Sequence, residues 1–411
     1  MVNIKRYENG LRLVVKEMSG LMSVTMGILV GTGAASETDK EDGISHFIEH
    51  MQFKGTKKRN SFEVSDAFDK IGAQVNAFTG KDSTVYYAKC TLDHTKEAFE
   101  ALSDLFLNAT YPEDEMEREK GVIAEEISMN EDSPEDLCLD LLASAFYGKE
   151  NYGRNILGTQ ENVYSFTKED VAAYKKARYC PENIVISFAG GVKAEEAEKL
   201  VDEYFKGLEK GQFEQRERKI VHPALKKTKD KPIEQAHIAI CYPALERTHP
   251  LSDAMTAMSG ILGGNMSSRL FQEVREKRGL AYSVYSYANF YEECGSLNIY
   301  AGVNPAKAAD AYAAINAVIE DLKKNGVTDE EFSRSREQMK ASLFFANEST
   351  SSQMLLYGKH VLQQDKAFDF EEKMRKINEM KKEDVLKVIE LVFDESKQAV
   401  AAVGKLGELK L

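Results

Sequence analysis

The sequence predicts an α+β protein of two similarly folded domains, each a mainly antiparallel sheet with helices packed on one face. Its 411 residues exceed what a single hydrophobic core usually holds. Strand-like segments come in neighbouring pairs and helical segments come in runs, whereas a doubly wound parallel sheet would alternate the two strictly. The chain also repeats itself once. These three observations together favour an internal duplication.

The repeat consists of two pairs of matching segments at nearly one offset. Lys168–Val171 opens a helical segment before a strand-like run, and the same four letters recur at Lys382–Val385, 382 − 168 = 214 residues later. The strand-like segments 83–88 and 296–301 match with an offset of 296 − 83 = 213, and an alanine-rich helical segment follows each. The period is too long for a solenoid. Duplication is our prediction, and chance similarity between α+β segments is the alternative.

The boundary between the halves is expected in residues 209–232, a charged stretch that is poor in aliphatic runs and contains Pro223 and Pro232. We therefore predict a first domain over residues 1–210, a linker over 211–231 and a second domain over 232–411.

Hydrophobic periodicity predicts the elements of the first half in order. Asn9-Gly10 suits a hairpin turn, and Gly80-Lys81-Asp82 suits the loop of a second hairpin. The predicted strands are 11–16, 22–31, 73–78, 83–91 and 183–190. The predicted helices are 43–53, 61–71, 93–109, 113–130, 136–146 and 168–178.

Composition argues against several functional classes. The net charge of −13 is unsuited to general nucleic-acid binding. No apolar run approaches the roughly 20 residues of a membrane span, and the N-terminus lacks a signal-peptide pattern, so we expect a soluble, cytoplasmic protein without a membrane partner. The five cysteines are widely separated and form no CxxC pair, which favours reduced thiols. The glycine pairs 190–191 and 263–264 fit neither a Rossmann nor a P-loop motif.

The segment from His46 to His50 reads HFIEH, the HxxEH order of inverted zinc-protease motifs. On the predicted helix 43–53, with Asp42 as a plausible N-cap, the two histidines lie one turn apart and Glu49 lies beside them. Two imidazoles at this spacing can share a metal ion, while the opposite face is apolar. That face consists of Ile44, Phe47, Ile48 and Met51. A solvated pair of histidines is the alternative.

A catalytic zinc site needs a third protein ligand. The helical segment 112–130 supplies candidates, because its inward stripe of Met116, Ile123 and Ile127 fixes which carboxylates lie nearby. At ~100° per residue, Glu126 lies about 80° from this stripe and Glu125 about 180° from it. Glu119 shares the face of Glu126. An acidic surface helix is the alternative interpretation.

These motifs make the chain similar to the pitrilysin/insulinase family of inverted-motif zinc peptidases, in the two-domain branch typified by mitochondrial processing peptidase. The resemblance implies that His46, His50 and Glu126 hold one Zn²⁺ per chain, and that Glu119 supports them. Glu126 lies 126 − 50 = 76 residues after the second histidine, about as far as the family's third ligand does.

The resemblance covers nearly the whole chain. The segment 72–79 resembles the family's substrate-binding edge strand, which implies that Asn76, Ala77 and Phe78 bind substrate. The segment 275–282 resembles its Arg/Tyr motif, with Arg275 and Tyr282 as the functional pair.

The resemblance implies a zinc metalloendopeptidase that hydrolyses unfolded peptides, with Glu49 as general base on zinc-bound water. The family arranges four such domains around a chamber, so we expect a homodimer with Arg275 and Tyr282 supplied in trans. One alternative is a catalytically inactive scaffold or assembly subunit of the same fold. A second is an HxxEH metal-dependent lyase of the S-ribosylhomocysteine lyase type.

Overall fold

The computed structural model describes residues 1–211, 213, 218, 220–407, 409 and 411. The chain divides by its contacts into two compact units, which are described separately. The first unit contains Met1–Ile127, Asn155–Glu217 and Phe344–Asp369. The second contains Ser128–Arg154, Arg218–Leu343 and Phe370–Leu411.

The first unit is built on a six-stranded sheet in the order β1-β2-β6-β3-β5-β4. Neighbouring strands are antiparallel except β2 and β6, which are parallel. The strands are β1 (Val2–Arg6), β2 (Arg12–Glu17), β3 (Ser23–Val30), β4 (Gln74–Thr79), β5 (Thr84–Thr91) and β6 (Ile184–Gly190). Strand β6 is buried along its whole length, as expected of a central strand covered on both faces.

The expected helical layer lies on one face of this sheet. Among the described residues, the segments of this unit that precede Phe344 contain six complete α-helices and most of α4 (Glu113–Asp132). The six are α1 (Ile44–Gln52), α2 (Ser61–Asp69), α3 (Thr95–Asn108), α6 (Gln160–Ser165), α7 (Lys168–Arg178) and α8 (Ala194–Phe205). Apolar residues of α2, α3 and α8 form one core with alternate residues of β2, β3, β5 and β6. Period-2 strands and amphipathic helices bury their apolar sides in this way.

The second unit is built on a five-stranded sheet in the order β7-β11-β8-β10-β9. Its strands are β7 (Lys226–Lys229), β8 (Ala236–Ala244), β9 (Ala281–Phe290), β10 (Gly295–Val303) and β11 (Ala399–Val403). Again one neighbouring pair, β7 and β11, is parallel and the others are antiparallel. This order and these directions repeat those of β2-β6-β3-β5-β4, so the predicted duplication is confirmed at the level of topology.

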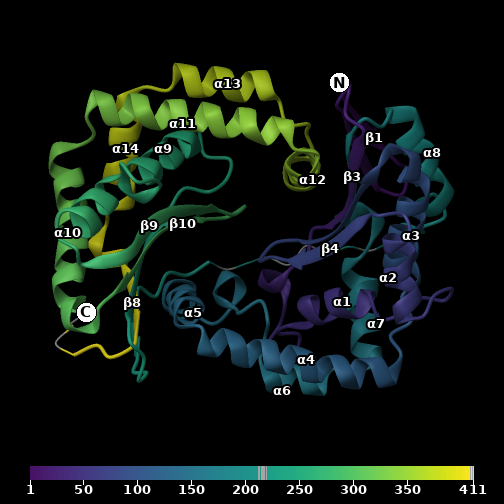
Figure 1. The fold of residues 1–411 in the computed structure, drawn as a ribbon, viewed down its shortest axis with the longest axis horizontal. Coiled ribbons are helices and arrows are strands. Elements are labelled where there is room, and N and C mark those ends of the chain that lie inside the picture. The colour runs from purple at the N-terminus through teal and green to yellow at the C-terminus, as the bar shows by residue number, and fades with distance from the viewer. Residues whose placement is uncertain (212, 214–217, 219, 408, 410) are drawn as a thin grey trace. The chain divides into compact units, whose positions relative to one another are not determined.

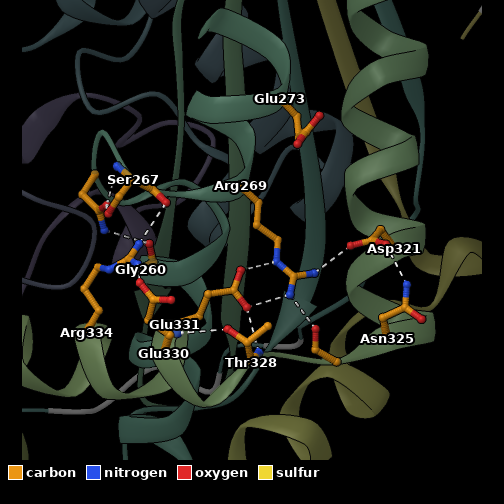
Figure 2. Close-up of polar contacts among 12 residues, drawn as sticks. Gly260, Ser267, Arg269, Glu273, Asp321, Asn325, Thr328, Glu330, Glu331 and Arg334 are labelled. Carbon is orange, nitrogen blue, oxygen red and sulfur yellow. Dashed lines mark hydrogen bonds and ion pairs between the residues drawn. The ribbon is translucent and has the colours of Figure 1, made fainter. Parts of the chain in front are cut away.

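Helices α9 (Ser252–Gly263), α10 (Ala308–Asn325), α13 (Phe370–Glu379) and α14 (Lys382–Val392) belong to the second unit, together with most of α11 (Asp329–Glu348). A cluster of polar contacts joins three of its segments (Figure 2). Arg269, just before the π-helical segment η5 (Phe271–Glu276), makes a bidentate pair with Glu331 of α11 at 2.7 and 2.8 Å. Its Nη1 donates to Asp321 of α10 at 3.0 Å. These contacts hold the start of η5 against the turn that connects α10 to α11.

Each unit also receives one helix from the other half of the sequence. Helix α12 (Thr350–Gln364) packs on β3 and β6 of the first unit, whereas α5 (Pro134–Tyr147) packs on β8 and β11 of the second (Figure 1). Helix α12 approaches β3 closely at Gly27, where an added Cβ would lie 2.4 Å from Met354 Sδ and the methionine side chain would have to shift. The boundary at 211–231 predicted from sequence contains strand β7 and does not describe these two exchanged segments.

The predicted strands and helices of the first half are all present, with ends that differ by a few residues. Strand β1 and helices α6 and α8 were not predicted. All five cysteines are buried, and none of them forms a disulfide bond. None of the helices among the described residues is long and apolar enough to cross a membrane.

Candidate metal centre

Helix α1 carries the HFIEH segment and begins one residue later than expected. The N-cap is Gly43, with φ +94°, so the prediction of Asp42 as N-cap is wrong. The capping carboxylate comes from Glu37 instead, which accepts hydrogen bonds from the backbone N–H of Gly43 at 2.7 Å and of Ser45 at 2.9 Å. A carboxylate at this position satisfies amides that the helix leaves unpaired.

The apolar faces that the sequence predicted for α1 and α4 meet in one buried cluster. Its members from these helices are Ile44, Phe47, Ile48, Met51, Met116, Ile123 and Ile127. This packing fixes which carboxylate of α4 faces α1. Glu126 is half-buried on that side, whereas Glu125 is exposed, as the helical geometry predicted.

Three side-chain atoms converge at this contact. His46 Nε2 lies 3.2 Å from His50 Nε2, and Glu126 Oε2 lies 3.7 and 3.5 Å from these two atoms. Ligands of a tetrahedral zinc ion at about 2.0–2.1 Å lie roughly 3.3–3.4 Å apart. Among the described residues, these three form a group whose ligand atoms all lie within 4.8 Å of one another. The arrangement therefore fits a metal ion held by two imidazoles and one carboxylate.

The pKa values of the two histidines shift in opposite directions. Burial and the neighbouring His50 lower the pKa of His46 to about 3, which keeps its imidazole neutral. Burial also lowers the pKa of His50, but its hydrogen bond to Glu119 and the charge of Glu126 outweigh this and raise it overall. His50 Nδ1 lies 2.8 Å from Glu119 Oε1. A Glu119 acceptor leaves the lone pair of His50 on Nε2, the atom that faces His46 and Glu126.

Glu49 lies beside the histidines but outside the ligand group. Burial raises its pKa, and a hydrogen bond from Thr79 Oγ1 opposes this rise. Thr79 is the last residue of β4, so this contact connects the predicted base to the strand that was predicted to bind substrate. A carboxylate with a raised pKa is suited to proton transfer near neutral pH.

Strand β4 is the edge of its sheet and pairs only with β5 among the described strands. Asn76 is exposed, while Ala77 and Phe78 are partly exposed. The N–H of Ala77 donates to the side-chain Oδ1 of Asn76 at 2.8 Å. Strand β4 thus has one edge that no other described strand covers.

Arg275 and Tyr282 lie together in the second unit. Arg275 belongs to η5, and its guanidinium lies over the ring of Phe271, 4.7 Å from the centroid, and over that of Tyr282, 5.4 Å from the centroid. Tyr282, at the start of β9, is 77% exposed. The pair is thus accessible to solvent, and cation–π stacking orients the arginine.

Three residues of the first unit that contact helix α1, Glu49 or Glu119 were not predicted from the sequence. Glu37 caps α1, Thr79 contacts Glu49, and Lys54 pairs with Glu119 at 2.6 Å. Only Lys54, four residues after His50 and thus one helical turn further, could have been found from helical spacing. The other two reach α1 from loops or strands.

The fold and the metal-binding group define a duplicated α+β protein suited to metal-dependent chemistry, and comparisons with known proteins agree. Residues 12–160 match the model described as "Insulinase (Peptidase family M16)", and residues 165–339 match "Peptidase M16 inactive domain". The chain is 40% identical to an uncharacterised zinc protease of Bacillus subtilis over 99% of both chains. A Streptomyces coelicolor protein with the same description is 36% identical, over 86% of this chain and 79% of that protein.

Solved structures share the fold. A protease from Helicobacter pylori matches with a TM-score of 0.91 at 23% identity, covering 98% of this chain and 99% of that one. A Pseudomonas fluorescens protein described as a peptidase M16 inactive domain matches with a TM-score of 0.93 at 20% identity, covering 100% and 99%. The chain thus belongs to the insulinase family, peptidase family M16, in its two-domain form.

Proposed function

We propose that the protein is a zinc metalloendopeptidase that hydrolyses peptide bonds in unfolded peptides. The observation that carries the proposal is the triangle of His46, His50 and Glu126, with Glu49 adjoining it. The relatives that are described as zinc proteases support the choice of metal and reaction.

The side chains of the first unit would have three roles: metal binding, proton transfer and orientation of a ligand. His46, His50 and Glu126 would hold one zinc ion per chain, and zinc bound there supplies Lewis acidity to a water molecule and to the scissile carbonyl. Glu49 would accept the proton of the attacking water and pass it to the leaving amine. Glu119 would orient His50 from behind.

The free edge of β4 supports an extended peptide as substrate. A peptide that adds as a further strand would take the N–H of Ala77 after displacing the Asn76 side chain, and Phe78 would line its path. Strand addition recognises backbone more than side chains, so we expect loose sequence preference and a need for unfolded substrate.

We further propose that the active form is a homodimer in which the partner supplies its Arg275 and Tyr282. The stacked guanidinium and the exposed phenol suit an oxyanion and a substrate carbonyl. Subunit mixing tests this arrangement. Glu49→Gln and Tyr282→Phe chains should each be nearly inactive, and mixed dimers should regain activity through one intact site. No recovery after demonstrated subunit exchange would exclude action in trans.

Zinc content and peptide cleavage test the site itself. Glu126→Gln should lose zinc while the matched Glu125→Gln retains it, because only Glu126 faces the histidines. Equal zinc retention would exclude Glu126 as a ligand. The wild-type protein should cleave unstructured peptides, and a chelator or Glu49→Gln should abolish this cleavage.

A catalytically inactive scaffold of the same fold is the second candidate, because relatives include proteins described as inactive domains. That description matches residues 165–339, whereas the metal-binding group lies within the other matched region, residues 12–160. If the zinc-loaded wild type and Glu49→Gln show the same absence of cleavage while both bind peptide, the scaffold is the better description.

A further inference from the structure

The carboxylate of Glu119 has two partners, one on each oxygen. Oε1 lies 2.8 Å from His50 Nδ1, and Oε2 lies 2.6 Å from Lys54 Nζ. The side chain of Glu119 is only 6% exposed, so water satisfies little of its hydrogen-bonding capacity. A desolvated carboxylate depends on its partners for both its charge and its orientation.

Lys54 lies one helical turn after His50 and two residues beyond the end of α1. Its side chain is 26% exposed, and Glu119 is its ion-pair partner. The contact differs from an ordinary surface pair. On the same helix as Glu119, Lys120 pairs at 2.7 Å with Glu117, whose side chain is 71% exposed and therefore solvated. Solvated pairs of that kind contribute little.

We propose that Lys54 is a positioning residue of the metal centre, acting through Glu119 to set the orientation of His50. By holding Oε2, Lys54 stops the carboxylate from rotating away and keeps Oε1 on Nδ1 of His50. The imidazole is then fixed with Nε2 toward His46 and Glu126. This inference rests on the proposed zinc site, although it does not require peptidase activity.

The consequence is a measurable dependence of zinc affinity on Lys54. Outer partners of metal-ligating histidines commonly change metal affinity by about 10–100-fold when removed. Lys54→Met, which keeps the length of the stem without its charge, should raise the zinc dissociation constant by about 10-fold. Lys54→Arg keeps a cation for Oε2 and should stay within about 3-fold of wild type.

The experiment measures zinc affinity of metal-stripped protein by competition with a chromogenic chelator. Lys58→Met is the matched control in the same loop, because Lys58 pairs with Glu100 at 3.4 Å and has a 60% exposed side chain. It should bind zinc as wild type does. Far-UV circular dichroism of each stripped variant checks the fold, and Lys54→Gln replaces Lys54→Met if the latter does not fold.

A double-mutant cycle separates action through Glu119 from a general effect. In a Glu119→Gln background, Lys54→Met should change zinc affinity by less than about 2-fold, since no carboxylate remains to be held. The proposal is overturned if Lys54→Met binds zinc like wild type, if its loss persists in the Glu119→Gln background, or if Lys54→Arg is no better than Lys54→Met. A wild type that binds zinc but cleaves no peptide would contradict the proposed function and leave this inference standing.

Discussion

The amine of Lys175, which is largely buried against helix α1, should make the stability of the first unit depend on pH. Lys175 of α7 donates to the hydroxyl of Tyr111 at 2.7 Å, and its amine lies 5.3–5.8 Å from the ring centroids of Phe106, Tyr111 and Tyr179. No carboxylate among the described residues pairs with it. Burial alone lowers the pKa of Lys175 to about 7. The perturbation is Lys175→Met, which removes the titrating group and keeps the apolar stem.

The direction in which stability changes with pH follows from proton binding to Lys175. Between pH 7 and 10.5 the unfolded chain holds a proton on Lys175 that the folded chain has released, so stability rises with pH across this window. For a pKa of 10.5 unfolded and about 7 folded, the rise from pH 7 to pH 9 is about 2 kcal/mol. Because part of the residue is accessible to solvent, we expect about 1–2 kcal/mol. Lys175→Met should lack this rise.

The assay is urea unfolding of metal-stripped protein at pH 7 and pH 9. Pulsed hydrogen exchange, read from peptides of α7 and β6, measures the unfolding of the first unit. This local readout is needed because the chain has two units, and a global signal would mix their unfolding transitions. Comparing variants at each pH cancels titrations that they share. Lys176→Met is the control, since Lys176 is exposed on the same helix and should follow wild type. Parallel pH dependence in wild type and Lys175→Met would refute the reasoning.

Four further outcomes are expected. Thr79→Val removes the hydrogen bond that lowers the pKa of Glu49, so the acidic limb of the pH profile of kcat/KM should move to higher pH; an unmoved limb would contradict Glu49 as the base. Glu37→Ala should lower the stability of the first unit by about 1–2 kcal/mol in urea unfolding, by exposing the start of α1. Ile123→Ala should cost about 2–4 kcal/mol, because its side chain is fully buried between α1 and α4; a loss below 1 kcal/mol would argue against this packing. Arg269→Met should lower the melting temperature while leaving zinc affinity unchanged, since its partners all lie in the second unit.

Much of the candidate site could be predicted because it depends on two helical patterns. The apolar faces of α1 and α4 are periodic in sequence, so each face fixes the direction of the polar residues on the same helix. Helical geometry therefore distinguished Glu126 from Glu125. The family resemblance supplied the pairing of α4 with α1, which periodicity within single elements could not give. The repeat at an offset near 214 predicted two similar sheets, and their strand orders agree.

Contacts between distant segments had no signal in a single sequence. Glu37 caps α1 from a preceding loop, and Thr79 contacts Glu49 from an edge strand. Both residue types are common, and neither by itself indicates such a contact. The exchange of α5 and α12 between the units was also hidden, because an amphipathic helix does not specify which of two similar sheets it covers. The sequence by itself thus determined the residue types of the candidate metal centre, their helices and the duplication. Only the tertiary structure decided which loops, strands and exchanged helices complete each unit, because those contacts depend on packing between elements and not on the period of any one of them.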